Sequence, residues 1–249
     1  NSAVLPALFD RDMLGYDALV FTDRLIHASL HQGCRTASAR GIRFHHNDLT
    51  HLESLLEKYA GQDGQKFILT ESIFSMDGDR ADLAALCDLA DTYDAFLYVD
   101  EAHATGVLGP KGMGLSGDVP ERIDLVMGTF SKALGSFGGY VACSQKLKDY
   151  LINRSAGFIY STSLPPGVLG AIDAALDLVP GLDDERSRLK RHSEHLRTAL
   201  MAHGLDTCSS SSQIVPAVIG GVEETLKVAQ ILEDAGLLGI AIRPPTVPK

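Results

Sequence analysis

Two stretches of the chain carry residues that could act together on one small molecule. Lys132 lies in the run GTFSKALG (128–135), and Asp100 comes directly after the apolar run 96–99. A lysine amine can form a Schiff base with an aldehyde, and a buried carboxylate can hold a proton on a pyridine nitrogen. The pair therefore predicts a binding site for pyridoxal phosphate, which needs both groups.

Asp100 can be interpreted as the partner of the cofactor's ring nitrogen, as a helix cap or as part of a helicase motif. A carboxylate about 4 Å from a pyridinium contributes on the order of 4 kcal/mol at an effective dielectric of 20, enough to keep the ring nitrogen protonated. An Asp after a strand can also simply cap the next helix. The letters Asp-Glu-Ala-His (100–103) occur in nucleotide-hydrolysing helicases as well, but those need a Gly-x-x-x-x-Gly-Lys-[Ser/Thr] phosphate loop, which this sequence lacks.

The surroundings of Lys132 favour a chemical role. Lysines usually keep the ammonium group in solvent. Here the apolar run 125–127 and the glycine-rich run 135–139 flank Lys132 and predict a desolvated lysine, able to serve as nucleophile and proton shuttle. Thr129 could donate its hydroxyl to a phosphate oxygen. His27, just past the apolar run 18–22, could stack on a flat ring or, equally, lie at a helix N-terminus.

The elements that must position these residues follow an α/β pattern. Short apolar runs alternate with helical patterns, including one at 49–59 behind a Thr50-x-x-Glu53 capping box and another at 83–90. This order predicts a largely parallel sheet with flanking helices and its site at the carboxyl ends of the strands. The expected strands are 18–22, 42–45, 67–70, 96–99, 125–127 and 140–143.

The composition changes after Pro165 and Pro166. Helical patterns at 167–178, 183–203 and 223–235 are joined by apolar runs at 214–219 and 239–242, which we expect to be strands. We expect residues 1–182 to form a large cofactor-binding domain whose N-terminal part lies outside this chain. Residues 183–249 would form part of a smaller α+β domain.

Charge and composition argue against several classes of protein. The net charge of −10 disfavours a nucleic-acid or anionic-membrane surface. No apolar run approaches the roughly 20 residues that span a bilayer, and no signal peptide opens the chain, so we expect a cytoplasmic protein. The four scattered cysteines read as reduced core residues, and His45 and His46 have no third ligand at a suitable spacing, so no metal site is expected.

Five motifs occur in order over nearly the whole chain, and together they are far more specific than any one alone. They resemble the α-oxoamine synthases, which are pyridoxal-phosphate enzymes of fold type I. The motifs are DRLIHAS (23–29), FSMDGD (74–79), VDEAHATG (99–106), GTFSK (128–132) and FIYSTSLPP (158–166).

The resemblance implies roles for individual residues. Lys132 would bind the cofactor aldehyde, Asp100 would pair with the pyridine nitrogen, and His27 would stack over the ring. His103 and Ser75 would lie near the phenolic oxygen.

Other implied roles concern the phosphate and the partner subunit. Thr129 would hold the phosphate. Ser161 or Thr162 would reach the phosphate of the neighbouring subunit's cofactor, since family members are homodimers with shared sites.

The resemblance also implies a reaction, the decarboxylative joining of an amino acid to an acyl-CoA or acyl carrier protein. The runs YST (160–162) and IAIRPPTVP (240–248) are most similar to members that join L-alanine to a pimeloyl thioester, and Thr246 would then line the substrate site. Members that use another amino acid or acyl chain remain alternatives. So does an inactive fragment, because the family's phosphate-covering glycine-aromatic pair and its carboxylate-binding arginine would fall outside residues 1–249.

Overall fold

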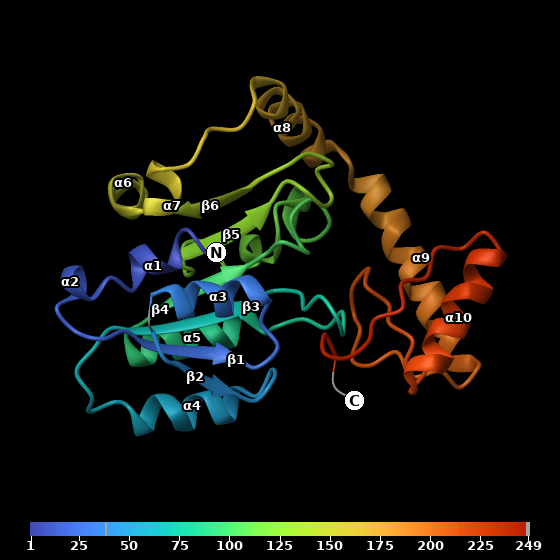
Figure 1. Cartoon of the computed structure of the whole chain (residues 1–249), viewed down its shortest axis with the longest axis horizontal. Coiled ribbons are helices and arrows are strands. Elements are labelled where there is room, and N and C mark those ends of the chain that lie inside the picture. Colours follow the sequence, from blue (N-terminus) through green and yellow to red (C-terminus); the bar gives the residue numbers. More distant parts are fainter. Residues whose placement is uncertain (38, 248–249) are drawn as a thin grey trace. The chain divides into compact units, whose positions relative to one another are not determined.

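The computed structural model of the protein describes residues 1–37 and 39–247 (Figure 1). The chain divides into two compact units. The first consists of Asn1–Phe74 and Arg80–Ser187, and the second of Ser75–Asp79 and Arg188–Lys249. The domain division expected after residue 182 stays a prediction.

In the described part of the first unit, six strands form one sheet in the order β2-β1-β3-β4-β5-β6. Neighbouring strands pair in parallel, except that β6 is antiparallel to β5. Each strand coincides with an expected apolar run, so the predicted, largely parallel sheet is confirmed. The strands are β1 (Leu19–Asp23), β2 (Gly41–Phe44), β3 (Lys66–Glu71), β4 (Ala95–Asp100), β5 (Leu125–Thr129) and β6 (Gly139–Cys143).

Helices cover both faces of this sheet, which explains why β1, β3 and β4 are apolar runs without alternation. Right-handed crossovers place α3 (Ala28–Thr36) on one face, because it connects β1 to β2. They place α4 (Leu49–Lys58) and α5 (Leu83–Tyr93) on the other face, because these lead in the opposite direction along the sheet. Consistent with this, α4 contacts α5, whereas α3 contacts α1 (Leu5–Leu8) (Figure 1).

The direction of the crossovers reverses between β1 and β3, which are neighbours in the sheet although β2 separates them in the sequence. In open α/β sheets, the carboxyl ends of strands at such a switch point form the crevice where ligands bind. β1 leads to His27, β3 ends at Glu71 and β4 ends at Asp100. The fold therefore gathers polar residues at the expected edge.

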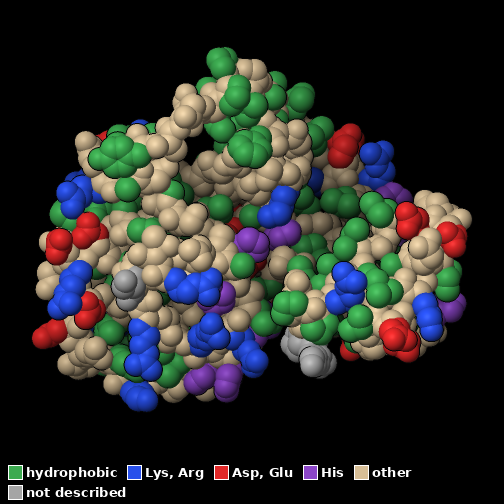
Figure 2. All heavy atoms as spheres, viewed as in Figure 1, with side chains coloured by type: hydrophobic (Ala, Val, Ile, Leu, Met, Phe, Trp, Pro, Cys, Tyr) green, Lys and Arg blue, Asp and Glu red, His purple; other side chains and the backbone are tan. Residues whose placement is uncertain are grey.

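Further helices and 3-10 turns complete the first unit. Hydrophobic side chains lie at the surface over α6 and α7 in Figure 2, and the side chains of Phe158 and Tyr160 are 60% and 86% exposed. The elements are α2 (Arg11–Leu14), α6 (Gln145–Arg154), α7 (Ala156–Ile159), α8 (Pro166–Leu178), and 3-10 turns at Pro110–Gly112, Leu115–Asp118 and Val179–Gly181.

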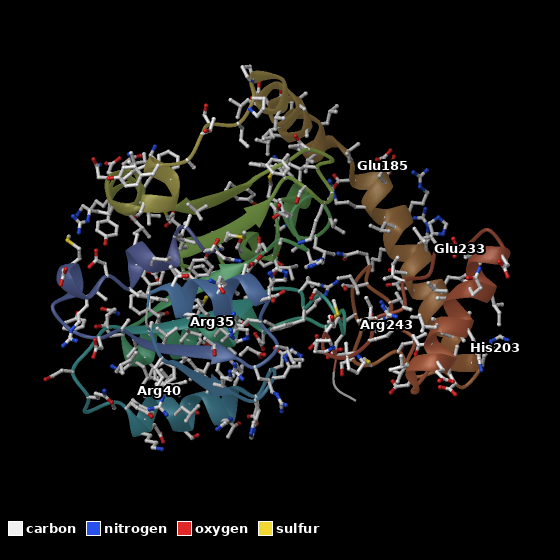
Figure 3. All side chains as sticks on the ribbon, viewed as in Figure 1. Arg35, Arg40, Glu185, His203, Glu233 and Arg243 are labelled. Carbon is white, nitrogen blue, oxygen red and sulfur yellow. The ribbon has the colours of Figure 1, made fainter. Side chains whose placement is uncertain are left out.

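The second unit is helical. α9 (Asp183–Ala202) enters it from the first unit, with Glu185 near its start and His203 just beyond its end in Figure 3, and α10 (Val222–Asp234) follows. The strands expected at 214–219 and 239–242 are wrong. A strand needs a neighbour for its backbone N–H and C=O groups, and the only pairing of these segments among the described residues is an isolated bridge between Asp206 and Val218.

The helix α4 begins two residues earlier than its predicted capping box. Asp48 is the N-cap residue, and its side chain accepts the backbone N–H of His51 at 2.9 Å. Thr50 lies exposed within the first turn. The Thr50-x-x-Glu53 capping box is therefore wrong, because a better acceptor precedes it.

Two further expectations can be compared with the described residues. No helix among them is long and apolar enough to cross a membrane. Cys34 and Cys87 are buried, as expected of core residues, but Cys208 is exposed, so the expectation is wrong for this one.

Candidate active site

Asp100 ends β4 and is only 4% exposed. Each of its carboxylate oxygens has a donor: Oδ2 accepts from Asn1 Nδ2 at 2.7 Å, and Oδ1 accepts from the Ala102 N–H at 2.9 Å. The amide of Asn1 is itself fixed, because its Oδ1 accepts from the hydroxyl of the buried Tyr98 at 2.6 Å. These bonds hold the Asp100 carboxylate in one orientation.

Glu71 is a second buried acid at this edge, and it was absent from the expected site. It ends β3, is 2% exposed, and is the register partner of Asp100 on the adjacent strand. Burial, and then the charge of Asp100, raise the pKa of Glu71 to about 8. The sequence carried a signal for it, since Glu71 follows an apolar run just as Asp100 does.

His27 lies at the N-terminus of α3. Its Nδ1 accepts the Ser29 N–H at 3.2 Å and is 2.8 Å from Ser29 Oγ, so His27 is the N-cap residue. Its backbone N–H donates to Glu71 Oε1. The interpretation of His27 as a helix N-terminal histidine is confirmed, and the imidazole remains exposed at the crevice.

His103 follows β4 and is half-buried. Burial first, and then the positive charge of Lys132, lower its pKa to about 4, although the charge of Asp100 opposes them. The imidazole is therefore neutral near pH 7 and contributes hydrogen bonding rather than charge. Asp100 is the register partner of Met127 on β5, the strand that leads to Lys132, so His103 and Lys132 both follow neighbouring strand ends.

Lys132 lies in the loop between β5 and β6. The loop is closed by hydrogen bonds from the Gly135 N–H to the Lys132 carbonyl (3.0 Å) and from the Ser136 N–H to the Phe130 carbonyl (2.8 Å). This turn leaves the Lys132 side chain exposed. The expectation of a desolvated lysine is wrong for this chain, because the Lys132 side chain is exposed, although its charge still acts on His103 and Glu71.

Hydroxyl groups gather beside this loop. Thr129 ends β5, and its Oγ1 donates to the Gly138 carbonyl at 2.9 Å and lies 2.8 Å from Ser131 Oγ. A cavity of about 770 Å³ is lined in part by Thr129, Ser131 and Ser161. The sequence analysis did not predict Ser131 as a site residue, although it lies between Thr129 and Lys132, which were expected there. Thr162 is exposed and lies next to Ser161.

Comparison with known proteins gives a consistent result. Residues 6–249 match the model of the family "Aminotransferase class I and II". The chain belongs to this family. The prediction of an α/β fold of fold type I is confirmed, and the resemblance to the α-oxoamine synthases is confirmed by the relatives within the family.

Several members of the aminotransferase class I and II family are close to this chain. It is 59% identical over 250 residues to the 8-amino-7-oxononanoate synthase of Gluconacetobacter diazotrophicus, and 62% identical over 248 residues to a Bordetella pertussis protein given that name provisionally. These matches cover 100% of this chain but 63% and 62% of the relatives. The chain thus spans less than two thirds of their length.

Solved structures of the family agree with the fold. Serine palmitoyltransferase from Sphingomonas wittichii matches with a TM-score of 0.90 at 27% identity, covering 99% of this chain and 62% of that one. The 8-amino-7-oxononanoate synthase from Francisella tularensis matches with a TM-score of 0.83 at 27% identity, covering 99% and 72%.

Two expected site residues of this family member belong to the second unit. Ser75 opens the segment Ser75–Asp79, in which the Gly78 carbonyl accepts from Ser212 Oγ at 2.7 Å. Thr246 is exposed in a turn, and its N–H donates to the Arg243 carbonyl at 3.0 Å. The roles of Ser75 and Thr246 stay predictions.

A group of possible metal ligands lies between the end of β2 and the first turn of α4. His45, Asp48 and His51 bring ligand atoms within 4.8 Å of one another, so the expectation that no third ligand is available is wrong. Their atoms serve the start of α4 instead. His51 Nδ1 accepts the His45 N–H at 3.0 Å, and Asp48 caps the helix.

Proposed function

We propose that this protein is a pyridoxal-phosphate-dependent acyltransferase of the α-oxoamine synthase type. Its reaction would condense L-alanine with a pimeloyl thioester, releasing carbon dioxide and the thiol, to give 8-amino-7-oxononanoate for biotin synthesis. The carrying observation is the grouping of Asp100, His103 and Lys132 at the carboxyl ends of the paired strands β4 and β5. The names of the relatives at 48–62% identity support the substrates.

The donor set of the first unit fits pyridoxal phosphate. The cofactor needs an amine, an anion at its ring nitrogen, a planar neighbour and donors for its phosphate. The amine would come from Lys132, the anion from Asp100 and the planar neighbour from His27. The hydroxyls of Thr129 and Ser131 offer the last. A structure of SPT with PLP has the same fold, with a TM-score of 0.91 at 29% identity.

Lys132 and Asp100 would carry the proton chemistry. When bound, pyridoxal phosphate supplies an electron sink for negative charge at the α-carbon of the amino acid. Asp100, fixed by Asn1 and Ala102, would keep a proton on the ring nitrogen. Lys132 would take the α-proton as general base, so that this carbon can bond to the thioester carbonyl as the thiol leaves. Carbon dioxide is then lost from the amino-acid carboxyl group.

The remaining residues would bind and orient. His27 would cover one face of the ring from the N-terminus of α3. His103, neutral at pH 7, would hydrogen-bond near the phenolic oxygen together with Ser75. Thr129 would hold the phosphate, and Thr246 would line the amino-acid and acyl site.

The protein would act as a homodimer in the cytoplasm. Ser161 or Thr162 would reach the phosphate bound by the partner subunit, so each site would need both chains. Coenzyme A and an acyl carrier protein both remain candidate carriers of the acyl chain.

A second candidate is another α-oxoamine synthase. The similarity to solved serine palmitoyltransferases favours palmitoyl transfer to serine, but these proteins are only 27–30% identical to this chain. The relatives named 8-amino-7-oxononanoate synthase are 48–62% identical. Incubation with alanine, serine or glycine and a matched series of acyl thioesters separates these, by mass spectrometry of the product. Carbon–carbon bond formation with serine and palmitoyl-CoA, but not with alanine and a pimeloyl thioester, would favour the alternative.

The site assignment is tested on Lys132. After borohydride treatment with pyridoxal phosphate, the parent protein should gain the mass of the reduced cofactor on the peptide that contains Lys132. Lys132→Ala should gain none and lose all condensation activity. Lys146→Ala, an exposed lysine on α6, serves as the control and should behave as the parent. Cofactor retained covalently by Lys132→Ala would contradict the assignment.

A further inference from the structure

Three neighbouring strands each end in a buried acid: Asp23 on β1, Glu71 on β3 and Asp100 on β4, with exposures of 0%, 2% and 4%. A buried carboxyl group needs hydrogen-bond partners or it keeps its proton. The three acids therefore differ according to the donors around them.

Asp23 and Asp100 are well supplied with donors. Asp23 accepts the Leu25 N–H at 2.8 Å and the Asn47 N–H at 2.8 Å, and it lies 3.0 Å from His46 Nδ1. Asp100 has a donor on each oxygen. These hydrogen bonds hold both carboxylates in fixed positions.

Glu71 is arranged differently. Its side chain accepts one hydrogen bond from the described residues, to Oε1 from the backbone N–H of His27. The charged and titratable groups that act on it are Asp100, Lys132 and Asp23, and burial is the largest cause of its raised pKa, about 8. At neutral pH Glu71 is therefore mostly a neutral acid, whose carbonyl oxygen is still able to accept the His27 N–H.

We propose that Glu71 is a positioning residue, which fixes the backbone of His27 so that the imidazole stands at a defined place over the cofactor ring. The inference rests on the proposed function, because it assumes that His27 stacks on pyridoxal phosphate. It adds a residue that holds the stacking group without touching the cofactor.

His27 is then held at two points. Glu71 anchors its backbone N–H from β3, and Ser29 anchors its ring through Nδ1. Ser29 Oγ in turn accepts from Asn1 Nδ2 at 2.8 Å, the amide that also donates to Asp100. The residue over the ring and the residue at the ring nitrogen therefore share one hydrogen-bonded frame.

The experiment separates the acceptor oxygen of Glu71 from its acidity. Glu71→Gln keeps an oxygen for the His27 N–H, whereas Glu71→Ala removes it. Arg35→Ala is the control, since it changes the exposed side of the same helix, α3 (Figure 3). The dissociation constant for pyridoxal phosphate and the visible circular dichroism of the bound cofactor, which reports how the ring is held, are measured at pH 7.

Glu71→Gln and Arg35→Ala should bind the cofactor within about twofold of the parent and keep its dichroism. Glu71→Ala should bind about tenfold more weakly, the factor that corresponds to losing about 1.4 kcal/mol, and lose at least half of the dichroic signal. If Glu71→Ala does not fold, Glu71→Asp replaces it, because the shorter side chain withdraws the acceptor from His27.

Two results would overturn the inference alone. One is a Glu71→Ala (or Glu71→Asp) variant that matches the parent in cofactor affinity and dichroism. The other is a Glu71→Gln variant that loses as much affinity and dichroism as Glu71→Ala. In either case the parent still binds pyridoxal phosphate through Lys132, so the proposed function stands. A parent that binds no cofactor would overturn the proposed function and this inference together.

Discussion

At the scale of single residues, burial and hydrogen bonding assign different tasks to chemically similar groups. Glu71 and Asp100 are register partners on adjacent strands, but Asp100 accepts two N–H donors while Glu71 lies beside the charge of Asp100. One buried anion and one buried neutral acid are less costly than two adjacent anions. Of this pair, Asp100 can thus present the negative charge to a ring nitrogen.

We predict that His103 stays neutral well into the acidic range. Its lowered pKa of about 4 means that the folded protein binds no proton there between about pH 4 and 6.5, whereas the unfolded chain does. The check is a ¹⁵N NMR titration of the histidine ring. Lys132→Met should raise the pKa, because it removes a positive charge that acts on His103. A midpoint near 6.5 in the parent would contradict the role of burial.

We predict that Glu71 makes the fold less stable as the pH rises. Its pKa lies near 8 when folded and near 4.5 when unfolded, so between these values only the folded state holds the proton, and stability falls through this window. The loss is on the order of 5 kcal/mol at most. Urea unfolding at pH 5 and pH 8 measures it: Glu71→Gln should gain stability relative to the parent at the higher pH. A difference between the two proteins that is the same at both pH values would contradict the shift.

At the scale of elements, the start of each helix decides where its side chains lie. α3 begins at His27, whose ring accepts the Ser29 N–H, and α4 begins at Asp48, whose carboxylate accepts the His51 N–H. Both caps follow strands that end at the same edge of the sheet. In α3, the capping residue is also the one that faces the crevice.

We predict that Asp48→Ala destabilises the protein by about 1 kcal/mol, the usual effect of losing an N-cap acceptor. Asp48→Asn should retain most of the stability, because its amide oxygen can accept the same N–H. Thr50→Ala should change the free energy of unfolding little, since Thr50 lies exposed inside the first turn. Chemical denaturation of the three variants measures this, and a larger loss at Thr50 than at Asp48 would restore the capping box.

At the scale of the whole molecule, exposed apolar side chains mark a surface suited to a second copy. Phe158, Ile159 and Tyr160 are 60%, 44% and 86% exposed, and Ser161, the proposed contact to the partner's cofactor, follows directly. Contiguous apolar side chains on a surface typically mark an interaction site. The segment therefore combines an apolar surface with a residue whose proposed role requires a partner.

We predict that Phe158→Glu shifts the protein from dimer to monomer, because a charge at a contact between subunits must be desolvated. The mass in solution by sedimentation equilibrium measures this. Ile231→Glu, at a 66% exposed position on α10, is the matched control and should leave the dimer intact. A dimeric Phe158→Glu variant, or a monomeric parent, would contradict the prediction.

Much of the fold could be predicted from local patterns. Strands buried on both faces leave continuous apolar runs, and all six were located because this signal needs no knowledge of neighbours. The order of strands and helices then implied a parallel sheet with its site at the carboxyl ends. The runs at 214–219 and 239–242 misled for the same reason, since an apolar run does not show whether a pairing strand is present.

The sequence by itself determined which chemical groups the protein has and which of them follow strands: Lys132, Asp100, His103, His27 and Thr129. Only the tertiary structure decided how these groups affect one another. The pairing of Glu71 with Asp100, the exposure of Lys132 and the anchoring of His27 arise between residues far apart in the chain. Charge, burial and hydrogen bonding act through distance in space, and that distance exists only once the sheet has formed.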